Sequence, residues 1–415
     1  MQTLADQTIP RQNFFYFFGV CLSFFVFVVR PGEVFPVLAG TRLGLVSFVF
    51  TCVAFFVSSG PQAIREGEFP GLKLMQLLLF LGFLVIPFSR WPRHALEGWY
   101  TILLINTLLY FFWLPFVRSP HQLRKLVKFF VLAGGILALA ILFLDFTQVT
   151  QYGRVSVGAT YDPNDIAMVL AVVFPMNVAF FMQGKLTSKL FWGALLVCLV
   201  LGILSTGSRG GILSLTVACL LLLFTTGKRV KAWHKIFVVL LVAGFFMSPF
   251  ADTVKERWQD VLSGVDYNIQ NPEVGGVGRL SLWISGMQLI VENPLTGVGV
   301  SNTTNAMGIE FGRWRSLHNS YFQAGLELGL VGLVLFIMLL KTAWRNCSQA
   351  LPLLDENHEL RSFALLAVSA RISIVTYITA AFFLSHAYSL ILPILLLISN
   401  GLYYISEAGI KEGGS

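Results

Sequence analysis

The feature that most constrains this chain is a series of apolar runs, each long enough to cross a lipid bilayer. A membrane-spanning helix needs about 20 predominantly apolar residues, because the hydrocarbon layer is about 30 Å thick. Runs of this kind recur along the whole 415-residue sequence. Hydrophobic residues make up 56% of the chain and charged residues 12%, far from the composition of soluble globular proteins. The sequence therefore predicts an all-α polytopic membrane protein.

We predict about twelve transmembrane helices. The first, Phe14 to Val29, follows a single Arg11 and lacks a small-x-small cleavage site, so we interpret it as a retained helix and not a signal peptide. The predicted spans are residues 13–29, 43–59, 72–89, 97–117, 126–146, 165–182, 188–204, 210–226, 235–250, 318–340, 362–384 and 386–405. Three regions follow: helices one to nine in 1–250, a large loop in 251–317, and helices ten to twelve with a tail in 318–415.

The positions of the lysines orient these spans. With the N-terminus inside, ten of the eleven lysines fall in cytoplasmic connections, and only Lys255 lies outside. The opposite orientation would place the lysine-rich loops outside, so we reject it. We therefore predict that both termini are cytoplasmic and that residues 251–317 lie outside. The net charge of +8 comes mostly from the inner loops, so it does not indicate nucleic-acid binding.

The outer connections carry arginine as nearly their sole cation. The arginines predicted outside are Arg30, Arg42, Arg90, Arg93, Arg154, Arg209, Arg257, Arg279, Arg313 and Arg315. Membrane orientation does not require arginine in particular, whereas phosphate recognition benefits from its planar, always-charged fork. We interpret the first four as interfacial anchors and expect a phosphate-binding role among the others.

Two polar segments precede the predicted helices six and eight. Around Pro163, Asp162 and Asn164 are typical of a turn, and Asp165 is expected to cap helix six. Arg154 and Asp162 are candidate ligand contacts. In the second segment, glycines surround Arg209 at the start of helix eight. A helix N-terminus beside a guanidinium is a natural anion site, and a tight turn with an arginine reaching to lipid headgroups is the alternative.

The long outer loop contains a predicted amphipathic helix. Residues 279–291 have helical periodicity, with a simple lid element of the loop as the alternative role. The expected apolar face is Leu280, Trp283, Ile284, Met287, Ile290 and Val291. Such a helix would lie on the membrane surface or cap the bundle. Pro294 ends it, and Gly297 to Gly299 form the loop that follows.

A histidine closes this loop directly before helix ten. His318 titrates near neutral pH and can accept a proton from a hydroxyl group, although an interfacial histidine can also be purely structural. Nine residues later, Glu327 points away from His318, and we expect a structural partner for it, Arg371. The sequence shows no outer acidic cluster suited to a divalent cation, so no metal or cofactor is predicted.

Taken in order, these segments resemble the O-antigen ligase/polymerase superfamily. It contains the ligases that attach O-antigen to lipid A–core, the Wzy-type polymerases and the bacterial O-oligosaccharyltransferases. The resemblance covers about 150–335. The matching segments are Ser205-Thr-Gly-Ser-Arg-Gly-Gly211, Gly278-Arg279, Trp283, Asn293-Pro-Leu-Thr-Gly-Val-Gly299 and His318-Asn-Ser-Tyr-Phe-Gln-Ala-Gly-Leu-Glu-Leu-Gly-Leu-Val-Gly332, with Asp162-Pro-Asn-Asp165 as a further likeness.

The resemblance implies a GT-C-like enzyme of the bacterial inner membrane with a periplasmic active site. It implies an inverting, metal-independent transfer from a glycan on undecaprenyl pyrophosphate to a hydroxyl acceptor. The acceptor is lipid A–core in a ligase and a growing O-antigen or exopolysaccharide in a polymerase, and the sequence leaves both open. By resemblance, Arg209 and Arg279 match the pyrophosphate-binding arginines, Arg154 matches a further phosphate contact, and His318 matches the proposed base. Possible contacts to the glycan or acceptor are Asp162, Asn164 and Asn319.

Two other classes of protein are weighed against this interpretation. Twelve helices is a common count for a secondary transporter, which would predict repeat symmetry and interrupted helices with polar groups at the midplane. The sequence shows neither. A lipid-II-type polymerase of the SEDS kind would need a catalytic carboxylate outside, which Asp162 could supply, but the histidine motif argues against it.

Overall fold

Helices make up nearly all of the structure, a computed structural model that describes residues 14–38, 40–58, 69–143, 148–149, 155–156, 162–225 and 279–413. The strands β1 (Gln148–Val149) and β2 (Val155–Ser156) form only a two-residue antiparallel ladder. The all-α class is therefore confirmed. The predicted span 235–250 and the part of the long loop before residue 279 lie outside the described residues.

The bounds of the helices divide the chain at the β ladder. Before it lie α1 (Phe14–Val29), α2 (Pro31–Val34), η1 (Pro36–Leu38), α3 (Leu43–Val57), α4 (Pro70–Leu84), η3 (Ile86–Phe88), α5 (Pro92–Gly98), the π-helix η4 (Trp99–Leu104), α6 (Ile105–Trp113), η5 (Leu114–Arg118) and α7 (Pro120–Phe143). After it lie α8 (Pro163–Gln183), α9 (Leu186–Ser205), α10 (Arg209–Thr225), α13 (Arg279–Glu292), α14 (Thr303–Phe311), α15 (Ser320–Glu356), α16 (Arg361–Ala381) and α17 (Ile391–Gly413).

Eight helical segments within the described residues are long and apolar enough to cross a membrane. They are Pro70–Phe88, Pro92–Arg118, Pro120–Phe143, Pro163–Gln183, Leu186–Ser205, Ser320–Glu356, Arg361–Ala381 and Ile391–Gly409. The shorter apolar helices α1, α3 and α10 coincide with three further predicted spans. The last two predicted spans are separated by a longer connection than expected, since α16 ends at Ala381 and α17 begins at Ile391. The total of twelve spans stays a prediction.

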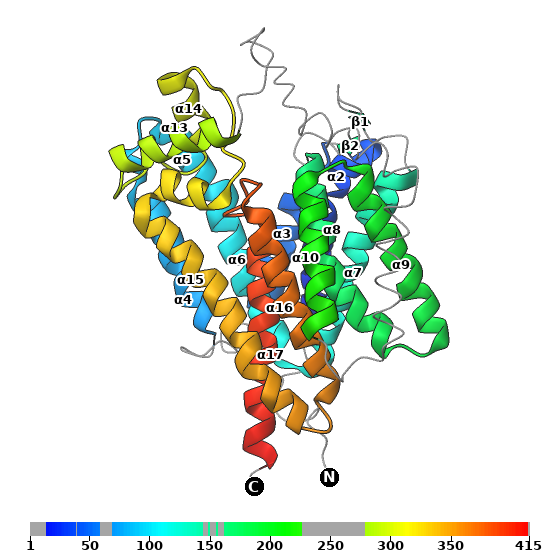
Figure 1. Cartoon of the computed structure of the whole chain (residues 1–415). Helices are drawn as coiled ribbons and strands as arrows, with labels where there is room; N and C mark the ends of the chain where they lie inside the picture. Colours follow the sequence, from blue (N-terminus) through cyan, green and yellow to red (C-terminus); the bar gives the residue numbers. More distant parts are fainter. Residues whose placement is uncertain are drawn as a thin grey trace.

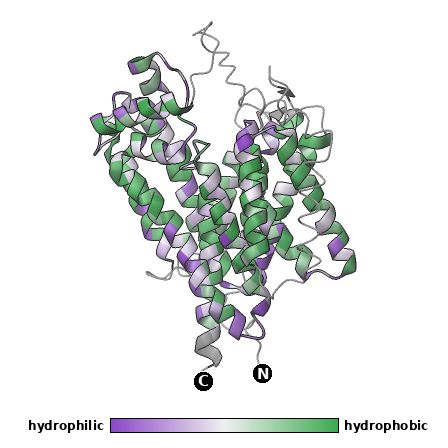
Figure 2. Ribbon diagram, viewed as in Figure 1, coloured by the Kyte–Doolittle hydropathy of each residue, from purple (hydrophilic) through white to green (hydrophobic). Residues whose placement is uncertain are grey.

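The helices form an elongated bundle with α13, α14 and α5 at one end, and the C-terminal end of α17 lies at the other (Figure 1). We call the first of these the α13 end. Hydrophobic residues predominate along the helices (Figure 2), and many large apolar side chains are exposed. Phe56, Phe80 and Leu190, for example, are 61%, 58% and 69% exposed. Large exposed apolar residues on many helices are expected of a surface that faces lipid.

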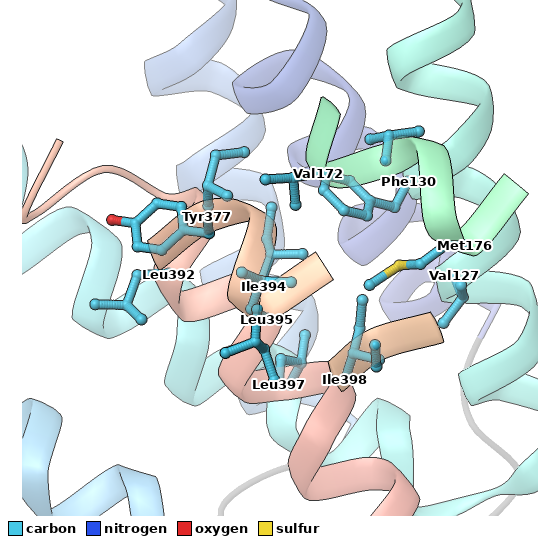
Figure 3. Packing of buried hydrophobic residues seen from close by; sticks show 14 of the residues in the cluster. Val127, Phe130, Val172, Met176, Tyr377, Leu392, Ile394, Leu395, Leu397 and Ile398 are labelled. Carbon is cyan, nitrogen blue, oxygen red and sulfur yellow. The ribbon is translucent and has the colours of Figure 1, made fainter. Parts of the chain in front are cut away.

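The core is built around α8, which packs against α7, α9, α10 and α16. Within its membrane-length window 89% of the residues are buried, against 28% for the peripheral Pro70–Phe88. Small residues allow the close packing: a Cβ added at Gly134 of α7 would lie 2.9 Å from Val173, and one at Gly202 of α9 would lie 2.9 Å from Leu170. The labelled side chains of this core in Figure 3 are Val127, Phe130, Val172, Met176, Tyr377, Leu392, Ile394, Leu395, Leu397 and Ile398.

Helix α15 is interrupted, contrary to the expectation of uninterrupted spans. Gly329 has φ 68° and ψ −174°, which lies outside the helical region. The loop after α13 fills the break: the N–H of Leu330 donates to the carbonyl of Pro294 (2.8 Å), and the N–H of Val298 donates to that of Leu326 (2.8 Å). A Cβ at Gly329 would lie 2.6 Å from the carbonyl oxygen of Leu295, so only glycine fits this approach.

The partner of Glu327 differs from the one predicted. Its Oε1 accepts a hydrogen bond from Oγ1 of Thr303 at 2.7 Å, and the residue is 1% exposed. Arg371, the expected partner, instead stacks over the ring of Trp344, 4.3 Å from its centroid. The burial of Glu327 is consistent with the predicted structural role. The predicted pair with Arg371 is wrong, because the inserted loop places Thr303 beside the carboxylate.

Candidate functional site

A continuous series of contacts joins the polar segments at the α13 end. Ser208, before α10, donates a hydrogen bond to Asn164 in the first turn of α8 (2.8 Å). Asp165 of the same turn contacts His386 in the α16–α17 connection (2.5 Å). The N–H of His386 donates to Oγ of Ser320 at the start of α15 (2.9 Å). Segments more than 200 residues apart in the sequence therefore meet at one end of the bundle.

The first turn of α8 is a capping box. Oδ1 of Asp162 accepts hydrogen bonds from the N–H groups of Asn164 (2.6 Å) and Asp165 (2.9 Å), and Oδ2 of Asp165 accepts from the N–H of Asp162 (3.3 Å). Pro163 occupies the first helical position, where its missing N–H costs nothing. The N-cap residue is therefore Asp162, and Asp165, which was predicted as a cap, completes the capping box from the third helical position. A carboxylate that serves two backbone donors has an evident structural role, and its expected contact with a glycan stays a prediction.

Arg209 is the first residue of α10, and its side chain is exposed. The turn before it is ordered by its own side chains, since Oγ of Ser208 accepts from the N–H of Gly211 (3.2 Å) and Oγ1 of Thr206 accepts from that of Ser208 (3.2 Å). Gly211 packs tightly, because an added Cβ would lie 2.3 Å from Cβ of Ala167 in α8. Gly211 therefore serves helix packing, while the side chain of Arg209 remains accessible.

The loop between α16 and α17 is a part of this site that the sequence reasoning did not select. Its backbone is held from three sides: Ser320 donates to the carbonyl of Leu384 (2.7 Å), the N–H of Ala387 donates to Gln323 (3.1 Å), and Tyr377 donates to the carbonyl of His386 (2.7 Å). Ser320 and Gln323 belong to the segment that begins with His318. That segment therefore positions a second histidine, His386, which no local sequence motif indicates.

The side chains of His386 and Asp165 form a largely enclosed pair, 18% and 14% exposed. Burial by itself disfavours the charged imidazolium, but the adjacent Asp165 carboxylate outweighs this, and the pKa of His386 lies above its ordinary value. Asp162 acts in the same direction and Arg30 in the opposite one. The pair is a histidine oriented by a carboxylate, an arrangement that fixes a ring and its proton.

Helix α13 packs on the bundle, but by a different face from the predicted one. Its protein-facing side is made of Leu282, Ser285, Gly286, Leu289 and Ile290. Of the predicted apolar face, Leu280, Ile284, Met287 and Val291 are 69%, 64%, 48% and 69% exposed. Gly286 contributes to this packing, since an added Cβ would lie 2.8 Å from a terminal methyl carbon of Leu317. The helix thus packs on the bundle, as in one of the two predicted roles, and leaves an apolar stripe on the outside. Contact of this stripe with the membrane surface stays a prediction.

The segment before α15 is docked onto α13. Nε1 of Trp283 donates to the carbonyl of Leu317 (2.9 Å), and a guanidinium nitrogen of Arg313 donates to the carbonyl of Ser281 (2.9 Å) and to Ser285 (2.8 Å). Arg313 therefore has a structural role here. These bonds hold the segment on α13 and so fix the position of His318, the residue after Leu317.

His318 has a left-handed backbone, with φ 48°, and a half-buried ring. Such a conformation costs a non-glycine residue about 1–2 kcal/mol and is retained where the surroundings over-determine it. Oγ of Ser316 lies 3.5 Å from Nδ1 and 3.4 Å from Nε2 of the ring. The strain and the docking of the segment give the ring a defined orientation at the α13 end.

The remaining predicted site residues are Asn319, Arg279 and Arg154. Asn319 is 1% exposed and caps α15, accepting hydrogen bonds from the N–H groups of Tyr321 (2.9 Å) and Phe322 (3.1 Å). The burial of Asn319 and its role as a cap explain why asparagine stands here, without any contact to a glycan. Arg279 is the first residue of α13, but its side chain lies outside the described structure. Arg154 lies outside the described residues altogether.

Comparison with known proteins finds one family model that matches the middle of the chain. Residues 194–337 match the family model described as O-Antigen ligase, a stretch that contains Arg209, Arg279 and His318. An uncharacterized protein of Haemophilus influenzae is 24% identical over 246 residues, which cover 54% of this chain and 59% of that protein. The resemblance found in the sequence is confirmed, and the match gives no support to a secondary transporter.

Proposed function

We propose that this chain, a member of the O-antigen ligase family through residues 194–337, transfers a glycan from undecaprenyl pyrophosphate to a hydroxyl acceptor. The family points to a membrane glycosyltransferase. We assign an inverting, metal-independent transfer with lipid A–core as the acceptor. The proposed site is the α13 end of the bundle.

One observation carries this proposal. Arg209 begins α10, Arg279 begins α13 and His318 precedes α15, and the series of contacts described above joins these three helix starts at one end of the bundle (Figure 1). A helix N-terminus presents partial positive charge, so three of them with two arginines favour an anionic ligand. The pyrophosphate of the donor is such a ligand.

The proposed reaction places charge where the arginines can stabilise it. As the bond between the anomeric carbon and the phosphate oxygen breaks, negative charge develops on the departing lipid pyrophosphate. Guanidinium groups of Arg209 and Arg279 would bind this charge more strongly in the transition state than in the ground state, which lowers the barrier. Arg154 is proposed as a further phosphate contact.

His318 is the proposed general base. Its ring would accept the proton of the acceptor hydroxyl while that oxygen attacks the anomeric carbon from the side opposite to the pyrophosphate. The new glycosidic bond then has the inverted configuration. The left-handed backbone of His318 and the docking of its segment on α13 are consistent with a ring that must be held in one orientation.

The site requires a position at the membrane surface. We propose that the α13 end faces the periplasm of an inner membrane, with residues 251–317 outside, and that both termini are cytoplasmic. The exposed apolar stripe of α13 would then contact the outer leaflet. Cysteine substitutions in α13 and in the tail, labelled with an impermeant reagent in intact cells, test this: the α13 cysteine should react and the tail cysteine should not.

The decisive experiment offers purified protein an undecaprenyl-pyrophosphate glycan with and without lipid A–core. A single mass increase of lipid A–core identifies a ligase, and a ladder of longer lipid-linked glycans identifies a polymerase. No product with either acceptor would contradict the proposal. In the same assay His318→Ala should lose about 10²-fold or more of the transfer rate yet still bind donor. His358→Ala, an exposed histidine after α15 at the other end of the bundle, is the matched control.

A further inference from the structure

The Asp165–His386 pair is the feature of the α13 end that the proposed mechanism does not use. Nε2 of His386 is engaged by Asp165 at 2.5 Å. Within the described residues, no group hydrogen-bonds the other ring nitrogen, Nδ1. This nitrogen is also not fully buried. The ring therefore has one nitrogen fixed by a carboxylate and the other accessible.

The surroundings place the loop that carries His386 beside the groups proposed to bind the donor. Phe383 on the same loop packs against Gly210, the neighbour of Arg209, since a Cβ at that glycine would lie 3.0 Å from Cβ of Phe383. On the other side, the backbone of His386 is tied to Ser320, two residues after His318. His386 thus lies on the loop between the proposed phosphate-binding arginine and the proposed base.

We propose that Nδ1–H of His386 donates a hydrogen bond to a phosphate oxygen of the lipid-pyrophosphate donor, with Asp165 as the residue that positions the ring. This inference rests on the proposed function, because the ligand is the same donor. An imidazole whose Nε2 faces a carboxylate carries a proton on Nε2. In the imidazolium, Nδ1 is protonated as well, and this N–H can donate a hydrogen bond to a phosphate oxygen. Charge-assisted hydrogen bonds of this kind are among the stronger ones.

The charged groups around His386 support this protonation state. Asp165 and Asp162 from the first turn of α8 favour the imidazolium, while burial and Arg30 oppose it, and the pKa of His386 is raised overall. The imidazolium therefore persists to a higher pH than an ordinary histidine allows. Donor affinity should be full below the ordinary histidine pKa and should fall as the pH rises through the raised one.

Two substitutions separate ligand binding from a merely structural role. The amide nitrogen of glutamine overlays Nε2 of histidine, so H386Q keeps a donor to Asp165 and loses the group at Nδ1. The amide nitrogen of asparagine overlays Nδ1, so H386N keeps a donor toward the ligand and loses the contact with Asp165. If the pair only holds the fold, H386Q resembles the wild type and H386N is the damaged protein.

The experiment measures binding of undecaprenyl pyrophosphate to the purified full chain in detergent, together with the melting temperature. We expect H386Q to melt like the wild type but to bind about tenfold more weakly, and to lose the pH dependence of binding. H386N should retain more affinity than H386Q despite a lower melting temperature. Equal affinity of H386Q and wild type would overturn the inference while leaving the proposed function intact. Absence of binding by the wild type itself would overturn both.

Discussion

Oγ of Ser208 donates a 2.8 Å hydrogen bond to Oδ1 of Asn164, and this contact joins the start of α10 to the first turn of α8. Both residues lie in segments that the sequence marked as polar and membrane-proximal. Ser208 is 1% exposed and also accepts from the N–H of Gly211. The contact thus sets the position of Arg209, the next residue, relative to α8.

Breaking this contact should impair transfer more than it impairs folding. In a double-mutant cycle of Ser208→Ala and Asn164→Ala, we expect a coupling energy of about 0.5–1.5 kcal/mol in thermal or chemical unfolding. The transfer rate of each single variant should fall, because Arg209 is displaced. Ser214→Ala is the control, since within the described residues that hydroxyl bonds only to the carbonyl of Gly210 in its own helix, at 2.7 Å. Additive effects of the two substitutions would contradict the proposed link.

The break in α15 should be intolerant of any side chain at Gly329. We expect Gly329→Ala to lower the free energy of unfolding by more than 2 kcal/mol, on the order of the backbone strain plus a clash with the carbonyl of Leu295. Gly312→Ala is the comparison variant, because Gly312 also has a positive φ (66°) but lies in the ordinary left-handed region (ψ 18°), with no described atom within 4 Å of an added Cβ. That control should cost only about 1 kcal/mol. Similar losses for both variants would show that the inserted loop does not constrain the break.

The buried carboxylate of Glu327 should depend on Thr303. Thr303→Val keeps the shape of the side chain and removes the donor to Oε1, so we expect a loss of about 1–3 kcal/mol in unfolding free energy. Thr216→Val is the matched control, since in the part of the chain that the structure describes its hydroxyl bonds only to the carbonyl of Ile212 in the preceding turn (2.9 Å). If the two variants unfold alike, Thr303 is not the significant partner of Glu327.

The Asp165–His386 pair should make stability dependent on pH. The pKa of His386 is raised in the folded protein, so its contribution is complete below the ordinary value of about 6.5 and is lost as the pH rises through the folded pKa. We expect the melting temperature to fall as the pH rises above the ordinary histidine pKa and through the raised one, and Asp165→Asn to flatten that dependence. A pH profile unchanged by the substitution would show that another group is responsible.

Much of the fold was predictable because the membrane imposes strong rules on a sequence. Apolar length alone located α8, α9 and α16 within a few residues, since a span must hold about 20 apolar residues. Motif spacing likewise placed Arg209 and His318 at helix starts. The packing face of α13 could not be predicted in this way. Its periodicity showed an apolar stripe, but the side that packs on the bundle is the one that carries Ser285 and Gly286.

The sequence by itself determined the candidate chemistry of the outer arginines and of His318. Residue identity fixes whether a group can bind phosphate or accept a proton, and no fold is needed to see it. Only the tertiary structure selected His386, through Asp165 at 2.5 Å and 221 positions away in the chain. A pair of this kind has no local pattern, because helix packing alone brings its two members together. For the same physical reason, the sequence could not show that Glu327 meets Thr303 and not Arg371.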